Sequence, residues 1–258
     1  LQHRGEYLFV AEGKRGLRVY DIASVANKGF SQRIISAPSS ELGQDINVES
    51  ANATCVVLPT TQPIHPARNQ GDLMRKTNME QPFFTIYNYA FVTDAEEGLI
   101  LVDVNTLSDG EFRNNHLDRA LTWNEGGVLD GVRHLAIAGT WFYAATPKGM
   151  VVLDMTDALK PRYVATIPLE DPRAAHVQFR YLFATTAKGL EVVDVTNPEA
   201  PRVTGAVVPL AHARKLHVAR TYAWVANGPD GIAIVNVTKP EAPVLYEMFN
   251  GGGEIRDA

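Results

Sequence analysis

The hydrophobic and polar positions of the chain repeat one pattern five times. Each copy has an apolar run rich in aromatic residues, a turn that contains glycine, a second apolar run, and then an aspartate or asparagine. The runs are short and dominated by Val, Ile, Leu, Phe and Tyr, which is typical of β-strands bounded by turns. We therefore predict a two-stranded hairpin in each copy, at residues 7–22, 89–104, 141–155, 181–195 and 222–237.

The spacing of the copies indicates a repeat of about 41 residues. The acidic or amide residues that end the copies are Asp21, Asp103, Asp154, Asp194 and Asn236. The intervals between them are 82, 51, 40 and 42 residues. The first interval predicts a loop insertion at about 38–82, and the second predicts a longer connection at 105–131.

Each repeat has room for two further strands. A proline-containing turn such as TNPEAPRV follows the aspartate, and an apolar stretch and a short strand such as AAHVQFR or KLHVAR come next. Four strands per repeat, with no helical periodicity, predict an all-β fold, a β-propeller of four-stranded blades with five blades visible. Blades recur because one four-stranded sheet cannot bury both of its faces alone.

Two positions of the repeat have an expected structural role. The glycine of the hairpin suits a turn with positive φ. The recurring aspartate or asparagine is expected to end the third strand and to accept hydrogen bonds from the backbone of the following turn. A row of catalytic carboxylates is the alternative, but the presence of the same residue type in every blade favours architecture.

The repeats predict one β-propeller domain over residues 1–258. The chain is expected to begin just before the second strand of one blade and to end at the first strand of another. Two arrangements follow from this: a five-bladed ring that the two ends close together, or a fragment of a larger ring with six or more blades. We favour the fragment, an excised or mature chain, because so few terminal residues cannot supply a whole inner strand.

Composition narrows the possible partners and cofactors. Apolar residues make up 45% of the chain, charged residues make up 21%, and the net charge of −5 leaves no basic stripe for nucleic acid. No apolar run approaches the roughly 20 residues that span a membrane. Cys55 is the single cysteine, so no intrachain disulfide or paired-cysteine metal site can form. The chain has no C-x-x-C-H motif and cannot hold a covalent c-type haem.

The motifs GLRVYDI, GLILVDV, GLEVVDV and GIAIVNV resemble those of the LVIVD-repeat β-propeller family. The resemblance covers most of the chain except about 38–82. It implies an extracytoplasmic protein, whether periplasmic, on the cell surface or secreted. Some long members of the family are similar to companions of multihaem cytochromes, which implies a haem-binding protein as one possible partner.

One constellation of side chains could carry chemistry. The strand segments RHLAI, AHVQF and LHVAR place His134, His176 and His217 at what we take to be the same blade position. If they face the propeller channel, they could bind a ligand or hold a metal ion. The alternative is a structural histidine copied by duplication. Basic side chains adjoin these histidines in the sequence and predict either an anion-binding site at the mouth of the channel or a solvent-exposed rim of mixed charge. They are Arg133, Arg173, Arg214 and Lys215.

The two long connections are either loops without a binding role or a partner-binding surface that includes His65, Arg68 and Trp123. Absence of a catalytic motif favours a non-catalytic scaffold for protein–protein interaction, with no cofactor in this chain. One alternative is a haem-free subunit of a multihaem cytochrome electron-transfer assembly. The other is a metal-dependent enzyme that uses the channel histidines, since a histidine can supply a general base near neutral pH.

Overall fold

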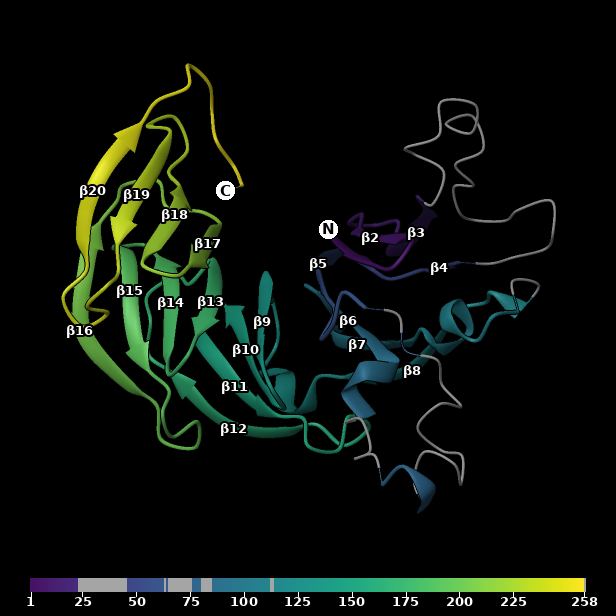
Figure 1. The fold of residues 1–258 in the computed structure, drawn as a ribbon. Coiled ribbons are helices and arrows are strands. Elements are labelled where there is room, and N and C mark those ends of the chain that lie inside the picture. Colours follow the sequence, from purple (N-terminus) through teal and green to yellow (C-terminus); the bar gives the residue numbers. More distant parts are fainter. Residues whose placement is uncertain (23–45, 63, 65–75, 80–84, 112–113, 258) are drawn as a thin grey trace. The chain divides into compact units, whose positions relative to one another are not determined.

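A computed structural model describes residues 1–22, 46–62, 64, 76–79, 85–111 and 114–257. Within them the chain forms five antiparallel sheets, each of four strands that follow one another in sequence (Figure 1). This confirms the predicted all-β fold with four-stranded propeller blades. None of the helices in the described part is long and apolar enough to cross a membrane.

The strands fall into two compact units. The first unit comprises Leu1–Asp130 and Met155–Pro161, and the second comprises Gly131–Asp154 and Arg162–Ala258. The sheets of the first unit are formed by β1 (Gln2–Arg4), β2 (Tyr7–Ala11), β3 (Leu17–Asp21) and β4 (Asn47–Val48), and by β5 (Ala53–Val57), β6 (Tyr89–Asp94), β7 (Gly98–Asp103) and β8 (Asp118–Trp123). Short 3-10 helices in this unit include η4 (Thr85–Asn88), η5 (Asn105–Ser108) and η7 (Glu125–Gly127).

The second unit contains three sheets. Their strands are β9 (His134–Ala138), β10 (Trp141–Thr146), β11 (Gly149–Asp154) and β12 (Arg162–Ile167); β13 (Ala174–Gln178), β14 (Tyr181–Thr186), β15 (Gly189–Asp194) and β16 (Arg202–Pro209); and β17 (Leu216–Ala219), β18 (Tyr222–Ala226), β19 (Ile232–Asn236) and β20 (Val244–Phe249). Figure 1 shows the first strands β9, β13 and β17 on one side of the unit and the fourth strands β12, β16 and β20 on the opposite side.

The middle strands of each sheet pack on both faces. In β14, Leu182 belongs to the core shared with the sheet β9–β12, whereas its neighbour Phe183 belongs to the core shared with the sheet β17–β20. Both side chains are almost completely buried. Burial of a side chain of this size contributes about 1.5–3 kcal/mol. Successive residues of a strand point to opposite faces, so a continuous apolar run serves two cores.

The recurring acidic or amide residue ends the third strand of every sheet, as expected. In the sheets whose third strands end at Asp103, Asp194 and Asn236, the side-chain oxygen of this residue accepts a hydrogen bond from the backbone N–H two residues later. Asp103 accepts from Asn105 at 2.8 Å, Asp194 from Thr196 at 2.9 Å, and Asn236 from Thr238 at 2.9 Å. These contacts form the turn that leads to the fourth strand.

The recurring glycine has a second reason to be glycine besides its positive φ. At Gly189, φ is 121°, and a Cβ atom would lie against the backbone carbonyl oxygen of Val208 in the fourth strand. The equivalent glycine of the β9–β12 sheet, Gly149, would meet the carbonyl oxygen of Ile167 at 2.6 Å. The third strand therefore begins at a residue without a side chain because the fourth strand passes directly over it.

Two of the predicted connections contain strands. The range 38–82 includes β4 and β5, so it is not a single loop, and 105–131 includes β8 as the fourth strand of its sheet. The buried residues of β5 do not alternate, because its pairing with β6 shifts between Ala53 and Cys55, and the exposed residues of β8 lack the expected apolar pattern. The chain also begins with β1, which pairs with β2, so the first sheet does not lack its first strand. The single domain and ring closure stay predictions.

Replacement of Gly189 by alanine is expected to destabilise the fold more than the same replacement at Gly205. Gly205 also has a positive φ, 82°, but no atom lies within 4 Å of the place that a Cβ would take there. Gly205→Ala should cost about 1–2 kcal/mol of backbone strain, and Gly189→Ala should cost more because the β16 backbone must move. Urea denaturation of both variants measures the difference. Equal midpoints would show that the carbonyl contact is unimportant.

Candidate functional site

The three predicted histidines lie in the first strands of the second unit, but not all at one position. His176 in β13 is paired with Phe183, and His217 in β17 is paired with Trp224, at equivalent registers. His134 is paired with Ala145, so it lies two residues earlier in its strand, β9, than the other two histidines do in theirs. The residue of β9 that corresponds to the other two histidines is Ala136. The expectation of three equivalent histidines is therefore wrong for His134, because the local sequence match ignored the strand register.

His134 links two neighbouring sheets. Its Nδ1 accepts a hydrogen bond from the backbone N–H of Ala175 in β13 at 3.3 Å. Burial, and to a smaller extent the charge of Lys215, lowers the pKa of His134 to about 4. The imidazole is therefore neutral at neutral pH, as an acceptor at Nδ1 must be.

His176 and His217 contact each other instead. Their ring centroids lie 5.2 Å apart with the rings nearly perpendicular. Burial and then the neighbouring His217 lower the pKa of His176. No group of three or more His, Cys, Asp or Glu side chains in the described ranges is placed to hold a metal ion.

Arginines occupy equivalent positions at the start of three consecutive sheets. The backbone N–H groups of Arg133, Arg173 and Arg214 donate to Ala145, Thr185 and Ala226, the equivalent carbonyls of the second strands. We call these three residues the arginine row. They line an open pocket of about 470 Å³ together with Ala211 and His212. The structure thus brings together three of the four bases predicted to form an anion mouth, whereas Lys215 is not among the pocket residues.

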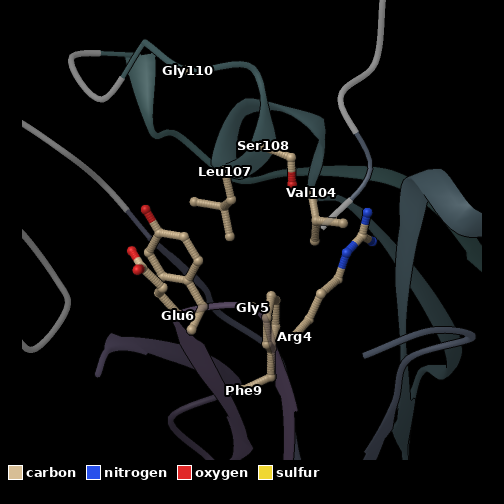
Figure 2. A pocket seen from close by; sticks show the side chains of 9 residues that line it. Arg4, Gly5, Glu6, Phe9, Val104, Leu107, Ser108 and Gly110 are labelled. Carbon is tan, nitrogen blue, oxygen red and sulfur yellow. The ribbon is translucent and has the colours of Figure 1, made fainter. Parts of the chain in front are cut away.

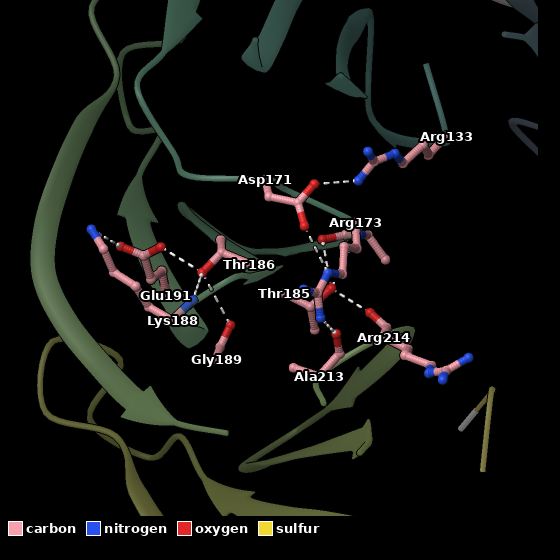
Figure 3. Close-up of polar contacts among 11 residues, drawn as sticks. Arg133, Asp171, Arg173, Thr185, Thr186, Lys188, Gly189, Glu191, Ala213 and Arg214 are labelled. Carbon is pink, nitrogen blue, oxygen red and sulfur yellow. Dashed lines mark hydrogen bonds and ion pairs between the residues drawn. The ribbon is translucent and has the colours of Figure 1, made fainter. Parts of the chain in front are cut away.

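A carboxylate bridges the first two members of the arginine row. Asp171 lies between them in Figure 3 and accepts from Arg133 at 2.5 Å and from Arg173 at 3.1 Å. Burial opposes ionisation of Asp171, but the two guanidinium groups lower its pKa below the usual value. Its φ of 48° places the carboxylate at a turn in a left-handed conformation, which aspartate tolerates better than most residues.

The C-terminal segment repeats the same bridge. Glu254 accepts from Arg214 at 2.6 Å and from Arg256 at 3.0 Å, and Asp257 pairs with Lys215 at 2.8 Å. Ile255, between these residues, exchanges backbone hydrogen bonds with Gly228. The sequences Asp171-Pro-Arg173 and Glu254-Ile-Arg256 therefore share one arrangement, in which the acid pairs with the arginine of the preceding sheet and with the arginine two residues later.

At the pocket, the carboxylate bridge between Arg173 and Arg214 is missing. The residue two places before Arg214 is His212, where the other two copies have an acid. Arg173 donates instead to the backbone carbonyl of Ala213 at 2.6 Å. The backbone of His212 is held by Asn227, whose side-chain oxygen accepts its N–H at 2.9 Å. His212 therefore stands, exposed to solvent, where the repeat would have a carboxylate.

The predicted partner-binding loops are only partly described. His65 and Arg68 lie outside the described residues. Trp123, expected in a connection, is the last residue of β8 and pairs with Leu99 of β7. The expectation that Trp123 lies in a loop is therefore wrong, and its role in partner binding stays a prediction.

Sequence reasoning missed the acids that pair with the arginine row. The signal was available as the recurrence of Asp-x-Arg, His-x-Arg and Glu-x-Arg one repeat apart, but the two acids lie in turns without an apolar pattern. It also missed Glu191, which is buried at a position that is apolar in neighbouring sheets. Thr186 donates to this carboxylate at 2.6 Å, and Lys188 lies 4.0 Å from it (Figure 3). With these partners, Glu191 is a satisfied structural carboxylate.

Comparison with known sequences decides the family. The LVIVD repeat matches residues 3–40, 87–110, 179–208 and 211–251, which together make up more than half of the chain. The chain belongs to the LVIVD-repeat family. The matched segments of this LVIVD-repeat protein include the glycine-bounded strand pairs of four of the five sheets. No curated protein matches the chain.

Solved structures of low sequence identity share the fold of this LVIVD-repeat protein. The computationally designed Ika8 protein has a TM-score of 0.58 at 10% identity over 100% of this chain and 63% of its own. A functionally unknown protein from Desulfotomaculum acetoxidans has a TM-score of 0.62 at 10% identity over 98% and 67%. PorZ, a surface component of the type-IX secretion system of Porphyromonas gingivalis, has 0.54 at 16% identity over 97% and 26%. The chain thus spans about two thirds or less of the length of these proteins.

Protonation of His134 should destabilise the protein at acidic pH. Its pKa falls from 6.5 to about 4 on folding, so the unfolded chain binds more protons between these values. Stability from this group is complete above pH 6.5 and is lost as the pH falls through the folded pKa of about 4, by roughly 3 kcal/mol in all. His134→Gln should flatten the pH dependence of the urea midpoint in that window.

The matched control is His116→Gln, because the side chain of His116 is exposed and makes no hydrogen bond within the described part of the chain. This variant should keep the wild-type pH dependence between pH 4 and 6.5. If His134→Gln also keeps it, the hydrogen bond from Ala175 does not depend on a neutral imidazole.

Proposed function

We propose that this LVIVD-repeat protein is a non-catalytic, extracytoplasmic scaffold that binds an acidic segment of a partner protein at the arginine row. The observation that carries the proposal is the missing carboxylate between Arg173 and Arg214, where the repeat has His212. The pocket at this position is open to solvent and lined by three guanidinium-bearing residues. A partner's carboxylate can therefore reach the place that the chain's own carboxylates occupy elsewhere in the row.

The two intact bridges indicate which chemistry fits the open position. In each, one carboxylate accepts from two arginines that belong to consecutive repeats, at distances between 2.5 and 3.1 Å. Charge-assisted hydrogen bonds of this kind are about twice as strong as neutral ones. An aspartate or glutamate of a partner would reproduce this pairing with Arg173 and Arg214.

The local charge also favours an acidic partner. Arg133 and Arg173 share one carboxylate, and Arg214 and Arg256 share another, so each pair keeps a net positive charge. The chain has a net charge of −5, so the arginine row is a positively charged region on a negatively charged protein. Complementary charge steers an acidic segment toward such a surface and sets the orientation in which it binds.

An extracytoplasmic location is supported by the family resemblance and by the fold shared with PorZ, which is a bacterial surface component. The location remains part of the proposal. The electron-transfer alternative, with a multihaem cytochrome as the acidic partner, stays a prediction that neither the fold nor the comparisons test.

The open position can be filled from within the chain. His212→Asp should restore the missing bridge, weaken binding of an acidic peptide by about tenfold or more, and leave the fold intact or stabilise it. The probe is a fluorescein-labelled peptide of alternating aspartate and glycine, and fluorescence anisotropy at low salt measures its affinity. The same peptide with asparagine in place of aspartate controls for binding that does not depend on charge.

Two arginine variants locate the binding. Arg173→Gln should weaken the peptide affinity as much as His212→Asp does. Arg202→Gln should leave it unchanged, because Arg202 is an exposed arginine paired with Asp194 on the neighbouring strand, outside the pocket. A wild-type protein that does not bind the peptide, or a His212→Asp variant that binds it as tightly, would contradict the proposal.

A further inference from the structure

Arg4, the last residue of β1 in the first unit, is a buried cation without a charged partner. Only 3% of its surface is exposed. Its Nη1 donates to the backbone carbonyl of Tyr87 at 2.8 Å, but its Nε and Nη2 are buried with no hydrogen-bond partner. Among the described residues no carboxylate forms an ion pair with it. Burial lowers the pKa of the guanidinium, which still remains protonated because an arginine does not lose its proton in proteins.

Such an arrangement is costly for a protein to keep. A buried charge loses its hydration, and only a counter-charge with good hydrogen bonds offsets that loss. Unsatisfied buried donors are rare in native structures, and each calls for an explanation such as a bound water or ion or a functional role. The two free donors of Arg4 are Nε and Nη2, which lie along one edge of the guanidinium group. That edge offers two parallel N–H groups, the geometry with which arginine binds a carboxylate in a bidentate manner.

A pocket adjoins this arginine. It has a volume of about 350 Å³, near the lower end of the range for small-molecule sites. Figure 2 shows Arg4 on one side of it, with Leu107 and Ser108 of the η5 turn facing it from above. Phe9 and Val104 add further apolar surface. The site thus combines a buried cation with a largely apolar wall.

The remaining polar groups limit the charge of a ligand. Tyr7 lines the pocket, and its hydroxyl oxygen accepts from Asn115 at 3.0 Å, so its own proton is available to donate. Burial raises the pKa of Tyr7, and the nearby carboxylates of Asp21 and Glu6 raise it further. Glu6 itself lines the pocket with an exposed side chain. These carboxylates disfavour a ligand with two negative charges.

We infer that this pocket binds a small monocarboxylate with an apolar body. The guanidinium group of Arg4, whose Nε and Nη2 are buried beside the pocket, would turn toward the ligand so that the carboxylate accepts hydrogen bonds from these two atoms. The apolar part would pack on Phe9, Val104 and Leu107. The site lies wholly in the first unit and is independent of the arginine row in the second. It can therefore be right or wrong separately from the proposed scaffold function.

The inference is tested by calorimetric titration of the full chain with hexanoate and with phenylacetate at neutral pH. We expect saturable binding of at least one of them to the wild-type protein, and an affinity at least about tenfold lower for Arg4→Met. Arg4→Met removes an unpaired buried charge and fills its space with an apolar side chain, so this variant should be at least as stable as wild type. Loss of binding without loss of stability separates ligand recognition from a failure to fold.

Arg15→Met is the matched control, because Arg15 lies in the same unit with a side chain that is 73% exposed. Its affinity for the carboxylates should equal that of the wild-type protein. The inference is overturned if neither carboxylate binds the wild-type protein at millimolar concentration, or if Arg4→Met binds as tightly. Competition by inorganic phosphate at equal concentration would overturn the assignment to a monocarboxylate.

Discussion

The fold depends on the burial of the middle strands of each sheet on both faces. Leu182 and Phe183 illustrate this constraint, since adjacent residues of one strand contribute to two different cores. A sheet of this kind is stable only between neighbours, so the same strand pair recurs with little change. The glycine beneath the fourth strand and the acid or amide that ends the third strand are consequences, because each fixes one turn of a unit that must be copied with the same geometry.

The side chains that differ from one sheet to the next lie in the short segments that lead into the first strands. These residues are held by backbone hydrogen bonds to the second strand, so their side chains need not match from one sheet to the next. Here the repeat carries arginines and bridging acids, and here one copy replaces an acid by His212. A change of one bridging acid to histidine thus creates a binding site in the arginine row and leaves the hydrophobic core unchanged. Arg4 likewise lies outside the repeated hairpin, in the first strand of its sheet, where the side chain can differ from those of the other sheets.

The sequence predicted what is local and repeated. The hairpins, the strand ends at Asp103 and Asp194, and the four-stranded sheets follow from patterns that recur at a fixed spacing. It did not predict the register of His134, because a short motif match cannot detect a shift of two residues along a strand. It could not reveal the pocket of Arg4, since that side chain shares the pocket with residues far away along the chain, at Val104 and Leu107.

Nuclear magnetic resonance of the arginine Nε–H groups shows whether the open position in the arginine row accepts a carboxylate. The signals can be assigned with single Arg→Lys variants, and the acidic peptide is then added to the wild-type protein. We expect the signals of Arg173 and Arg214 to change and those of Arg162 and Arg202 to stay in place, since the latter two pair with the acids that end the third strands. Changes confined to Arg162 and Arg202, or no change in any arginine signal, would rule out carboxylate binding at the open position.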